Sequence, residues 1–312
     1  MNAGILTRGR LWQHPVWGRA LSEDGLGRRL ILPIVVSDAV EERQRVEHAA
    51  GIERVSVTEA VREAQAAAVA GLAGVLLVAE TDRKDETALL SVQRDGVLPR
   101  AIRAIKERLP DLAVASEVCV CHHTAHGQCV LFGGDGADVA ATLERLGEIA
   151  QIHADCGADL LLPTGMLDGT ARAVREALTR DHPDVPVAAT VAMESALYAL
   201  GRAVVGAVPI PDRAVPLLAD ASAARARAER DIAAGADAIL VMPGVPALDV
   251  VAMLSTTTSV PVVSFQSAAE HALFTGDEDV GGPEVEREMI AAARRAGAAF
   301  VISYGGLSAL ER

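Results

Sequence analysis

Eight short apolar segments, separated by stretches of helical periodicity, constrain the fold of this 312-residue chain more than any other feature. Each segment is apolar along its whole length, which is typical of strands covered on both faces. The segments span residues 30–36, 74–78, 112–118, 160–163, 187–192, 238–242, 261–265 and 299–303. Strands that alternate with helices in this way predict an α/β fold with a parallel sheet.

The intervening stretches are rich in Ala, Glu and Arg and repeat apolar residues with the period of a helix. We expect helices over residues 57–70, 98–109, 139–156, 169–180, 221–235, 247–254 and 285–297. Eight strands that alternate with these helices predict a (β/α)8 TIM barrel over residues 30–312. No G-x-G-x-x-G motif follows the first strand, which disfavours a doubly wound open sheet.

Residues 1–29 precede the barrel and form a separate N-terminal arm in this interpretation. Leu11, Trp12, Trp17 and Leu21 make the segment apolar enough to pack against something. Two arrangements remain open: an arm that packs on a neighbouring subunit, or a helix that plugs the bottom of the barrel. The segment lacks the long apolar region of a signal peptide, so we expect a cytoplasmic protein.

Charge and composition exclude several classes of protein. The formal net charge is −13, and neither nucleic acid nor an anionic membrane surface attracts such a chain. Half of the residues are hydrophobic, which excludes a disordered chain. No apolar run reaches the roughly 18 residues that span a bilayer.

A loop rich in cysteine and histidine follows the third predicted strand. Cys119, Cys121 and Cys129 lie there with His122, His123 and His126. Three thiolates suit Zn²⁺, and a three-ligand set leaves a fourth position for water or substrate. A histidine of the loop could instead close the site and make it structural, and a set of free thiols is the remaining alternative.

Together with this loop, three further stretches resemble the porphobilinogen synthase (5-aminolevulinate dehydratase) family. They are residues 95–107 before the third strand, residues 166–178 after the fourth, and residues 261–266 with Glu270 at the seventh. The resemblance implies a (β/α)8 barrel, bound zinc, and an N-terminal arm used in homo-oligomer assembly. It also implies that Tyr304 and the arginines Arg202 and Arg213, beside Asp212, contact a substrate carboxylate.

The departures from the family fall on its covalent chemistry. The family holds two aminolevulinate molecules as Schiff bases on lysines that end the fifth and sixth strands, and the matching residues here are Met193 and Met242. A thioether cannot form an imine, because that bond requires a nucleophilic amine. The chain has two lysines, Lys84 and Lys106, and neither is at a matching position. A family serine after the seventh strand is replaced by Ala268.

We therefore predict a zinc-dependent, lyase-like enzyme that condenses, dehydrates or cyclises a small amino or keto acid without an imine. In a barrel, catalytic groups follow the strand ends. The predicted catalytic residues are Glu117, His122, His126, Asp168, Glu194 and Tyr304. The predicted substrate contacts are Arg202, Arg213, Gln266, Met193 and Met242. Asp168 has an alternative role as a helix cap. The alternatives for the whole protein are a non-catalytic binding or assembly partner and an authentic porphobilinogen synthase.

Overall fold

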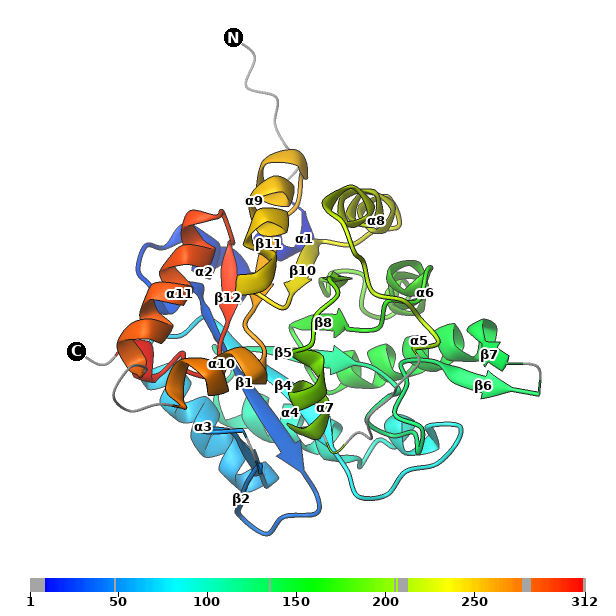
Figure 1. Cartoon of the computed structure of the whole chain (residues 1–312). Coiled ribbons are helices and arrows are strands. Elements are labelled where there is room, and N and C mark those ends of the chain that lie inside the picture. Colours follow the sequence, from blue (N-terminus) through cyan, green and yellow to red (C-terminus); the bar gives the residue numbers. More distant parts are fainter. Residues whose placement is uncertain are drawn as a thin grey trace.

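A computed structural model of the chain describes residues 9–47, 49–134, 136–204, 206, 213–276 and 282–310. Eight parallel strands form a nearly closed barrel surrounded by helices (Figure 1). In spatial order the strands are β8 (Leu160–Pro163), β5 (Ala113–Val118), β4 (Gly74–Glu80), β1 (Leu30–Ser37), β12 (Phe300–Ile302), β11 (Val262–Phe265), β10 (Ala238–Met242) and β9 (Ala188–Ala192). A parallel bridge between Leu161 and Val187 joins the two ends of this order. The predicted (β/α)8 fold is confirmed.

The seven predicted helices are present, with ends that differ from the prediction by a few residues. They are α3 (Val57–Val69), α4 (Val97–Arg108), α5 (Val139–Asp155), α6 (Thr170–Leu178), α8 (Ala221–Ala233), α9 (Leu248–Thr257) and α11 (Pro283–Arg295). Their starts follow capping chemistry: the Ser56 side chain accepts the Glu59 amide, and the Asp138 side chain accepts the Ala141 amide. Gly157 follows α5 with a φ of +99°, which lets the chain turn back into β8.

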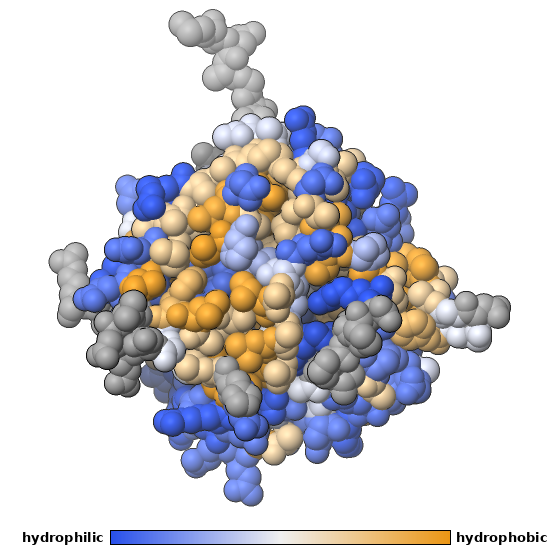
Figure 2. All heavy atoms as spheres, in the orientation of Figure 1, coloured by the Kyte–Doolittle hydropathy of each residue, from blue (hydrophilic) through white to orange (hydrophobic). Residues whose placement is uncertain are grey.

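Short elements that the sequence did not predict lie in the loops after the strands. They are β2 (Arg43–Arg45), β3 (Glu53–Val55), β6 (Leu131–Gly133), β7 (Gly136–Asp138), α7 (Tyr198–Val204) and α10 (Ala268–Thr275). Several of these elements surround the C-terminal mouth of the barrel. Apolar side chains gather in the middle of the face seen in Figure 2, where α7 and α10 lie in Figure 1. Leu273 of α10 is 70% exposed.

Side chains of the strands alternate between two apolar clusters. Ala188 belongs to the cluster inside the barrel, whereas its neighbour Ala189 belongs to the cluster between the sheet and the helices. This alternation decides which residues at the strand ends can face a ligand.

The N-terminal helices α1 (Arg10–Gln13) and α2 (Pro15–Ser22) close the bottom of the barrel. The Trp17 ring is fully buried, its Nε1 donates to the Asp159 carbonyl at 3.0 Å, and its centroid is 5.3 Å from that of Phe300. Asp159 and Phe300 lie at the N-terminal ends of strands. Residues 10–22 therefore pack into the bottom of the barrel, which is the second of the two arrangements left open by the sequence. Residues 1–8, which belong to the predicted assembly arm, lie outside the described residues. Among the described helices, none combines the length and the apolar content needed to cross a membrane.

Candidate metal and carboxylate site

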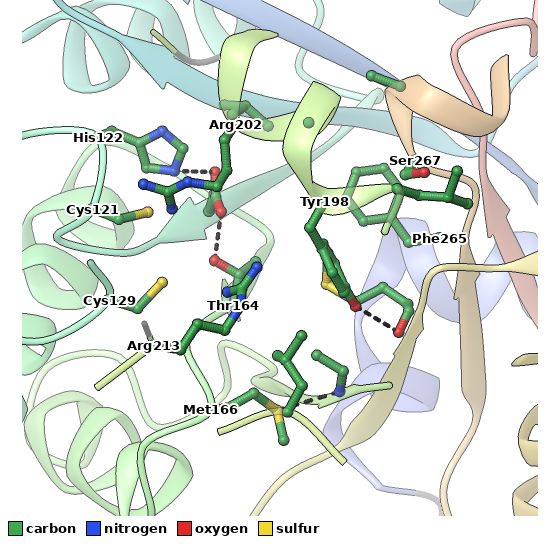
Figure 3. A pocket seen from close by; sticks show the side chains of 18 of the residues that line it. Cys121, His122, Cys129, Thr164, Met166, Tyr198, Arg202, Arg213, Phe265 and Ser267 are labelled. Carbon is green, nitrogen blue, oxygen red and sulfur yellow. Dashed lines mark hydrogen bonds and ion pairs between the residues drawn. The ribbon is translucent and has the colours of Figure 1, made fainter. Parts of the chain in front are cut away.

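A pocket of about 160 Å³ lies at the C-terminal ends of the strands, where the barrel fold predicts the chemistry (Figure 3). Its walls come from the end of β5, the cysteine loop, the loop after β8, helix α7, the segment from Arg213 to Leu217, and the ends of β10 and β11. Segments far apart in the sequence therefore share one cavity.

The three loop cysteines lie together beside this pocket. The Sγ atoms of Cys119 and Cys121 are 3.1 Å apart, and both residues are buried. Hydrogen bonds from Cys119 and Cys121 hold the pKa of Cys129 well below its usual value, although burial opposes this. Hydrogen bonds with Cys119 and Cys129, together with burial, raise the pKa of Cys121. One thiolate is thus favoured among three thiols in mutual contact.

This donor set fits a metal ion. The ligand atoms of Cys119, Cys121 and His122 lie within 4.8 Å of one another. The Nδ1 atom of His122 is buried and has no hydrogen-bond partner among the described residues. A buried ring nitrogen without a partner is costly unless a ligand satisfies it. Thiolate sulfur with imidazole nitrogen is a donor set that thiophilic ions such as zinc prefer.

Glu117 of β5 belongs to the same site and contacts two of its residues. Its Oε2 is 2.9 Å from Nε2 of His122, and its Oε1 accepts a hydrogen bond from Thr164 Oγ1 at 2.5 Å. Burial lowers the pKa of His122, but the charge of Glu117 outweighs burial and the pKa of His122 is raised. The pair can therefore hold a proton next to the cysteines.

The guanidinium groups of Arg202 and Arg213 line the pocket. Arg202 lies on α7, and burial lowers its pKa while Cys121 and Cys129 oppose this. The Cζ of Arg213 lies 5.3 Å from the ring centroid of Tyr198, in a cation–π contact. Figure 3 shows Arg202 and Arg213 on the side of the pocket that carries the thiols. This geometry suits an anionic ligand.

Tyrosine side chains complete the pocket. The Tyr198 hydroxyl donates to the Met242 carbonyl at 2.9 Å. Burial, and then the charge of Glu117, raise the pKa of Tyr304. The Tyr304 hydroxyl therefore stays protonated at neutral pH and can donate a hydrogen bond to a carboxylate.

The two lysines of the chain are engaged elsewhere. Lys84 Nζ donates to the Gly206 carbonyl at 2.7 Å. Lys106 Nζ lies 2.8 Å from Asp159 Oδ2, at the other end of the barrel. Neither residue is among those that line the pocket.

The two methionines at the strand ends differ in placement. Met242 lines the pocket, whereas Met193 packs in the outer cluster between sheet and helices. The residue of β9 that lines the pocket is Ala192. Because side chains alternate along a strand, Met193 and Ala192 face opposite sides. The predicted substrate contact by Met193 therefore has no geometric support.

Four other predicted residues lie outside the pocket lining. The Asp168 side chain is 78% exposed and forms an ion pair with Arg227 at 3.0 Å. Glu194 is exposed, because the chain leaves the barrel after β9. Gln266 is fully buried and alternates with Phe265, which lines the pocket. The His126 ring packs edge-on against Phe132, with centroids 4.8 Å apart.

The structure thus brings together Glu117, His122, Arg202, Arg213, Tyr304 and Met242 with the cysteines of the loop. Asp212 lies outside the described residues. Sequence reasoning missed Thr164 and Tyr198. Thr164 directly follows β8, so its position was a usable signal, whereas Tyr198 depends on the unpredicted helix α7.

Comparison with known proteins gives one consistent result. The sequence matches the family described as Delta-aminolevulinic acid dehydratase over residues 7–311. The dehydratase of Streptomyces coelicolor is 32% identical over 307 residues, which cover 95% of this chain and 93% of that protein. The dehydratase of Escherichia coli is 30% identical over 290 residues, which cover 91% of this chain and 90% of that protein.

Solved structures agree with the sequence relatives. The delta-aminolevulinic acid dehydratase (porphobilinogen synthase) of Toxoplasma gondii, solved with its reaction product porphobilinogen, has a TM-score of 0.86 and 26% identity. That match covers 97% of this chain and 90% of the Toxoplasma chain. A dihydropteroate synthase from Xanthomonas albilineans shares the fold alone, with a TM-score of 0.52 and 15% identity. Since the family match extends over nearly the whole sequence, the chain belongs to the delta-aminolevulinic acid dehydratase family.

Proposed function

We propose that this family member is a zinc-dependent, lyase-like enzyme that converts a small carboxylic acid without forming a Schiff base. Its substrate would be an amino or keto acid, and the reaction a condensation, dehydration or cyclisation. One observation carries the proposal: thiols, a proton-holding pair and two guanidinium groups share one pocket, while both lysines are bonded elsewhere. The loss of the family's Schiff-base lysines is part of the proposal. Met193 and Met242, at the matching positions, support it.

Each group in the pocket has a role that follows from its chemistry. Cys119, Cys121 and Cys129 would hold the metal, which supplies a Lewis acid when bound. Arg202 and Arg213 would hold the substrate carboxylate, and Tyr304 would donate a further hydrogen bond to it. His122 would exchange a proton with the substrate, while Glu117 fixes the imidazole and Thr164 fixes Glu117.

A non-catalytic protein with a structural metal site is the second candidate, and the position of His122 favours it. Its ring lies within the same 4.8 Å group as Cys119 and Cys121. A site closed by three cysteines and a histidine is typical of structural zinc. The two candidates differ in one measurable property, the presence of an exchangeable metal ligand.

The first experiment measures zinc content and porphobilinogen formation from 5-aminolevulinate. We expect about one zinc ion per chain, lost in Cys129→Ser and kept in the control Cys156→Ser, whose cysteine lies at the end of α5. We expect no porphobilinogen and no adduct trapped by borohydride. Product together with a trapped adduct on Lys84 would overturn the proposal.

The second experiment replaces zinc with Co²⁺ and records the visible absorption spectrum. A spectrum that changes when a carboxylate is added indicates an open coordination position and supports the enzyme. A four-coordinate spectrum that stays constant with carboxylate, and changes only in His122→Ala, supports the structural site instead.

A further inference from the structure

A fully buried carboxylate that is not among the pocket-lining residues contacts the chain on both sides of Tyr304. It belongs to Glu286 of α11. Its Oε1 accepts hydrogen bonds from the Ser303 hydroxyl at 2.6 Å and from the Gly305 amide at 3.0 Å. These two residues directly precede and follow Tyr304, which lines the pocket. One oxygen atom therefore holds both neighbours of a pocket residue.

The second oxygen of Glu286 connects the same segment to another wall of the pocket. Oε2 lies 2.7 Å from Nδ1 of His271, a buried residue of α10. This helix begins at Ala268, which lines the pocket together with Ser267. The rings of His271 and Tyr304 also lie near each other, with centroids 6.1 Å apart. Glu286 thus links the segment after β12 to α10, the neighbour of α11 in the helical shell (Figure 1).

The absence of a side chain at Gly305 makes room for this carboxylate. A Cβ atom added there would overlap the carboxyl group of Glu286. Because the position is a glycine, the carboxylate can approach the backbone closely enough to accept the amide hydrogen. A buried carboxylate is costly unless hydrogen bonds satisfy it, and this one has three hydrogen-bond partners. A buried network that is satisfied in this way makes its surroundings rigid.

We infer that Glu286, held by His271, is a positioning residue for Tyr304 and sets where the tyrosine hydroxyl meets the ligand carboxylate. The inference rests on the proposed function, in which Tyr304 donates a hydrogen bond to that carboxylate. Hydrogen bonds weaken steeply when their distance or angle departs from the optimum. A small shift of the backbone on either side of Tyr304 is therefore enough to weaken the contact.

Two substitutions at the same position test the hydrogen bonds. Glu286→Gln keeps them, because its amide oxygen can accept from Ser303 and Gly305 while its amide nitrogen donates to Nδ1 of His271. Glu286→Met has a similar size and removes all three. Calorimetric titration of the zinc-loaded protein with levulinate should show affinity about tenfold weaker in Glu286→Met and largely recovered in Glu286→Gln. Glu288→Met, at an exposed position of the same helix, is the control. Native affinity in Glu286→Met would overturn the inference.

The same substitution in a Tyr304→Phe background shows whether Glu286 acts through the tyrosine. Tyr304→Phe removes the hydroxyl and should itself weaken levulinate binding about tenfold. Since no hydroxyl remains to be placed, adding Glu286→Met should then cause no further loss. Equal losses in the two backgrounds would show that the substitution alters the pocket by another route, which contradicts a positioning role.

A spectroscopic measurement separates this inference from the proposed function. The chain has two tyrosines, Tyr198 and Tyr304, so labelling with 3-fluorotyrosine should give two fluorine NMR signals, which Tyr198→Phe assigns. The Tyr304 signal should move in Glu286→Met and stay near its native position in Glu286→Gln. If the native protein binds no carboxylate, the proposed function fails, whereas a Tyr304 signal that moves as expected still supports the positioning role. If carboxylates bind but neither the affinity nor the Tyr304 signal responds to Glu286→Met, the inference alone fails.

Discussion

His153 of α5 is a titratable side chain enclosed by the core. It is 3% exposed, and its Nδ1 lies 2.9 Å from the hydroxyl oxygen of Ser116 on β5. Burial lowers the pKa of His153 to about 4. In the unfolded chain the same imidazole titrates near its ordinary value of about 6.5. Between these two values the unfolded chain binds more protons than the folded one.

The stabilisation from neutral His153 is complete above the unfolded pKa and is lost as the pH falls toward the folded pKa. Between pH 7.5 and pH 5, this residue should remove about 2 kcal/mol from the free energy of unfolding. His153→Gln keeps a polar side chain that does not titrate. Between pH 7.5 and pH 5, its free energy of unfolding should therefore fall by about 2 kcal/mol less than that of the native protein. Guanidinium denaturation at both pH values measures the difference. Parallel pH dependences in the two proteins would contradict the prediction.

At the residue scale, distinctive chemistry led the sequence analysis to side chains that the fold brings close together. Residue type and position singled out the three cysteines, Glu117 and His122, which lie in or beside one pocket. Met193 was placed at the correct strand end but on the wrong face. Its neighbour Ala192 lines the pocket, because a shift of one residue along a strand reverses the side a residue faces. An apolar segment without alternation contains no signal for that choice.

At the scale of elements, Gln128 joins two loops that are 86 residues apart. It precedes Cys129, and its Oε1 accepts the amide hydrogen of Ala214, the residue after Arg213. The cysteine loop thereby fixes the segment that carries Arg213, one of the two arginines proposed to bind a carboxylate. Metal at the cysteines and a carboxylate at Arg213 are therefore expected to influence each other.

Gln128→Ala should weaken carboxylate binding by roughly 2- to 10-fold, as expected for one lost hydrogen bond. Removing zinc should weaken carboxylate binding in the native protein and have a smaller effect in the variant, because the connection is already broken. Calorimetry with and without zinc measures both effects. Gln151→Ala, on the exposed face of α5, serves as the control. The same zinc dependence in Gln128→Ala and in the native protein would contradict this coupling.

Whether a helix or strand can be predicted from the sequence depends on the number of residues in it. The eight barrel strands follow from uninterrupted apolar runs, and the seven long helices follow from helical periodicity. Helix α7 and the β2–β3 pair do not, because three to seven residues are too few to establish a period. These short elements carry or hold parts of the site: α7 supplies Arg202, and Arg54 of β3 donates to the Ala203 carbonyl at the end of α7 at 2.7 Å. Of the two pocket residues that the sequence analysis missed, Tyr198 lies on α7, whereas Thr164 follows the predicted strand β8.

The whole molecule depends on the N-terminal plug for its interior packing. Leu11, Trp17 and Leu21 belong to the same apolar cluster as the inward side chains of the barrel. Trp17→Ala should lower the free energy of unfolding by about 3–5 kcal/mol, since it opens a large cavity and removes a buried hydrogen bond. Trp12→Ala, at a partly exposed position on α1, should cost less. Denaturant unfolding of both variants makes the comparison, and similar losses would argue against a plug centred on Trp17.

The plug also determines how molecules pass through the barrel. Because α2 and the inward side chains fill the N-terminal end, a ligand enters and leaves at the C-terminal mouth. A product of the proposed reaction would therefore leave by the opening through which the next substrate enters. Accumulated product would compete with substrate for that opening. The reaction would therefore slow as the product concentration rises, even when the substrate concentration stays constant.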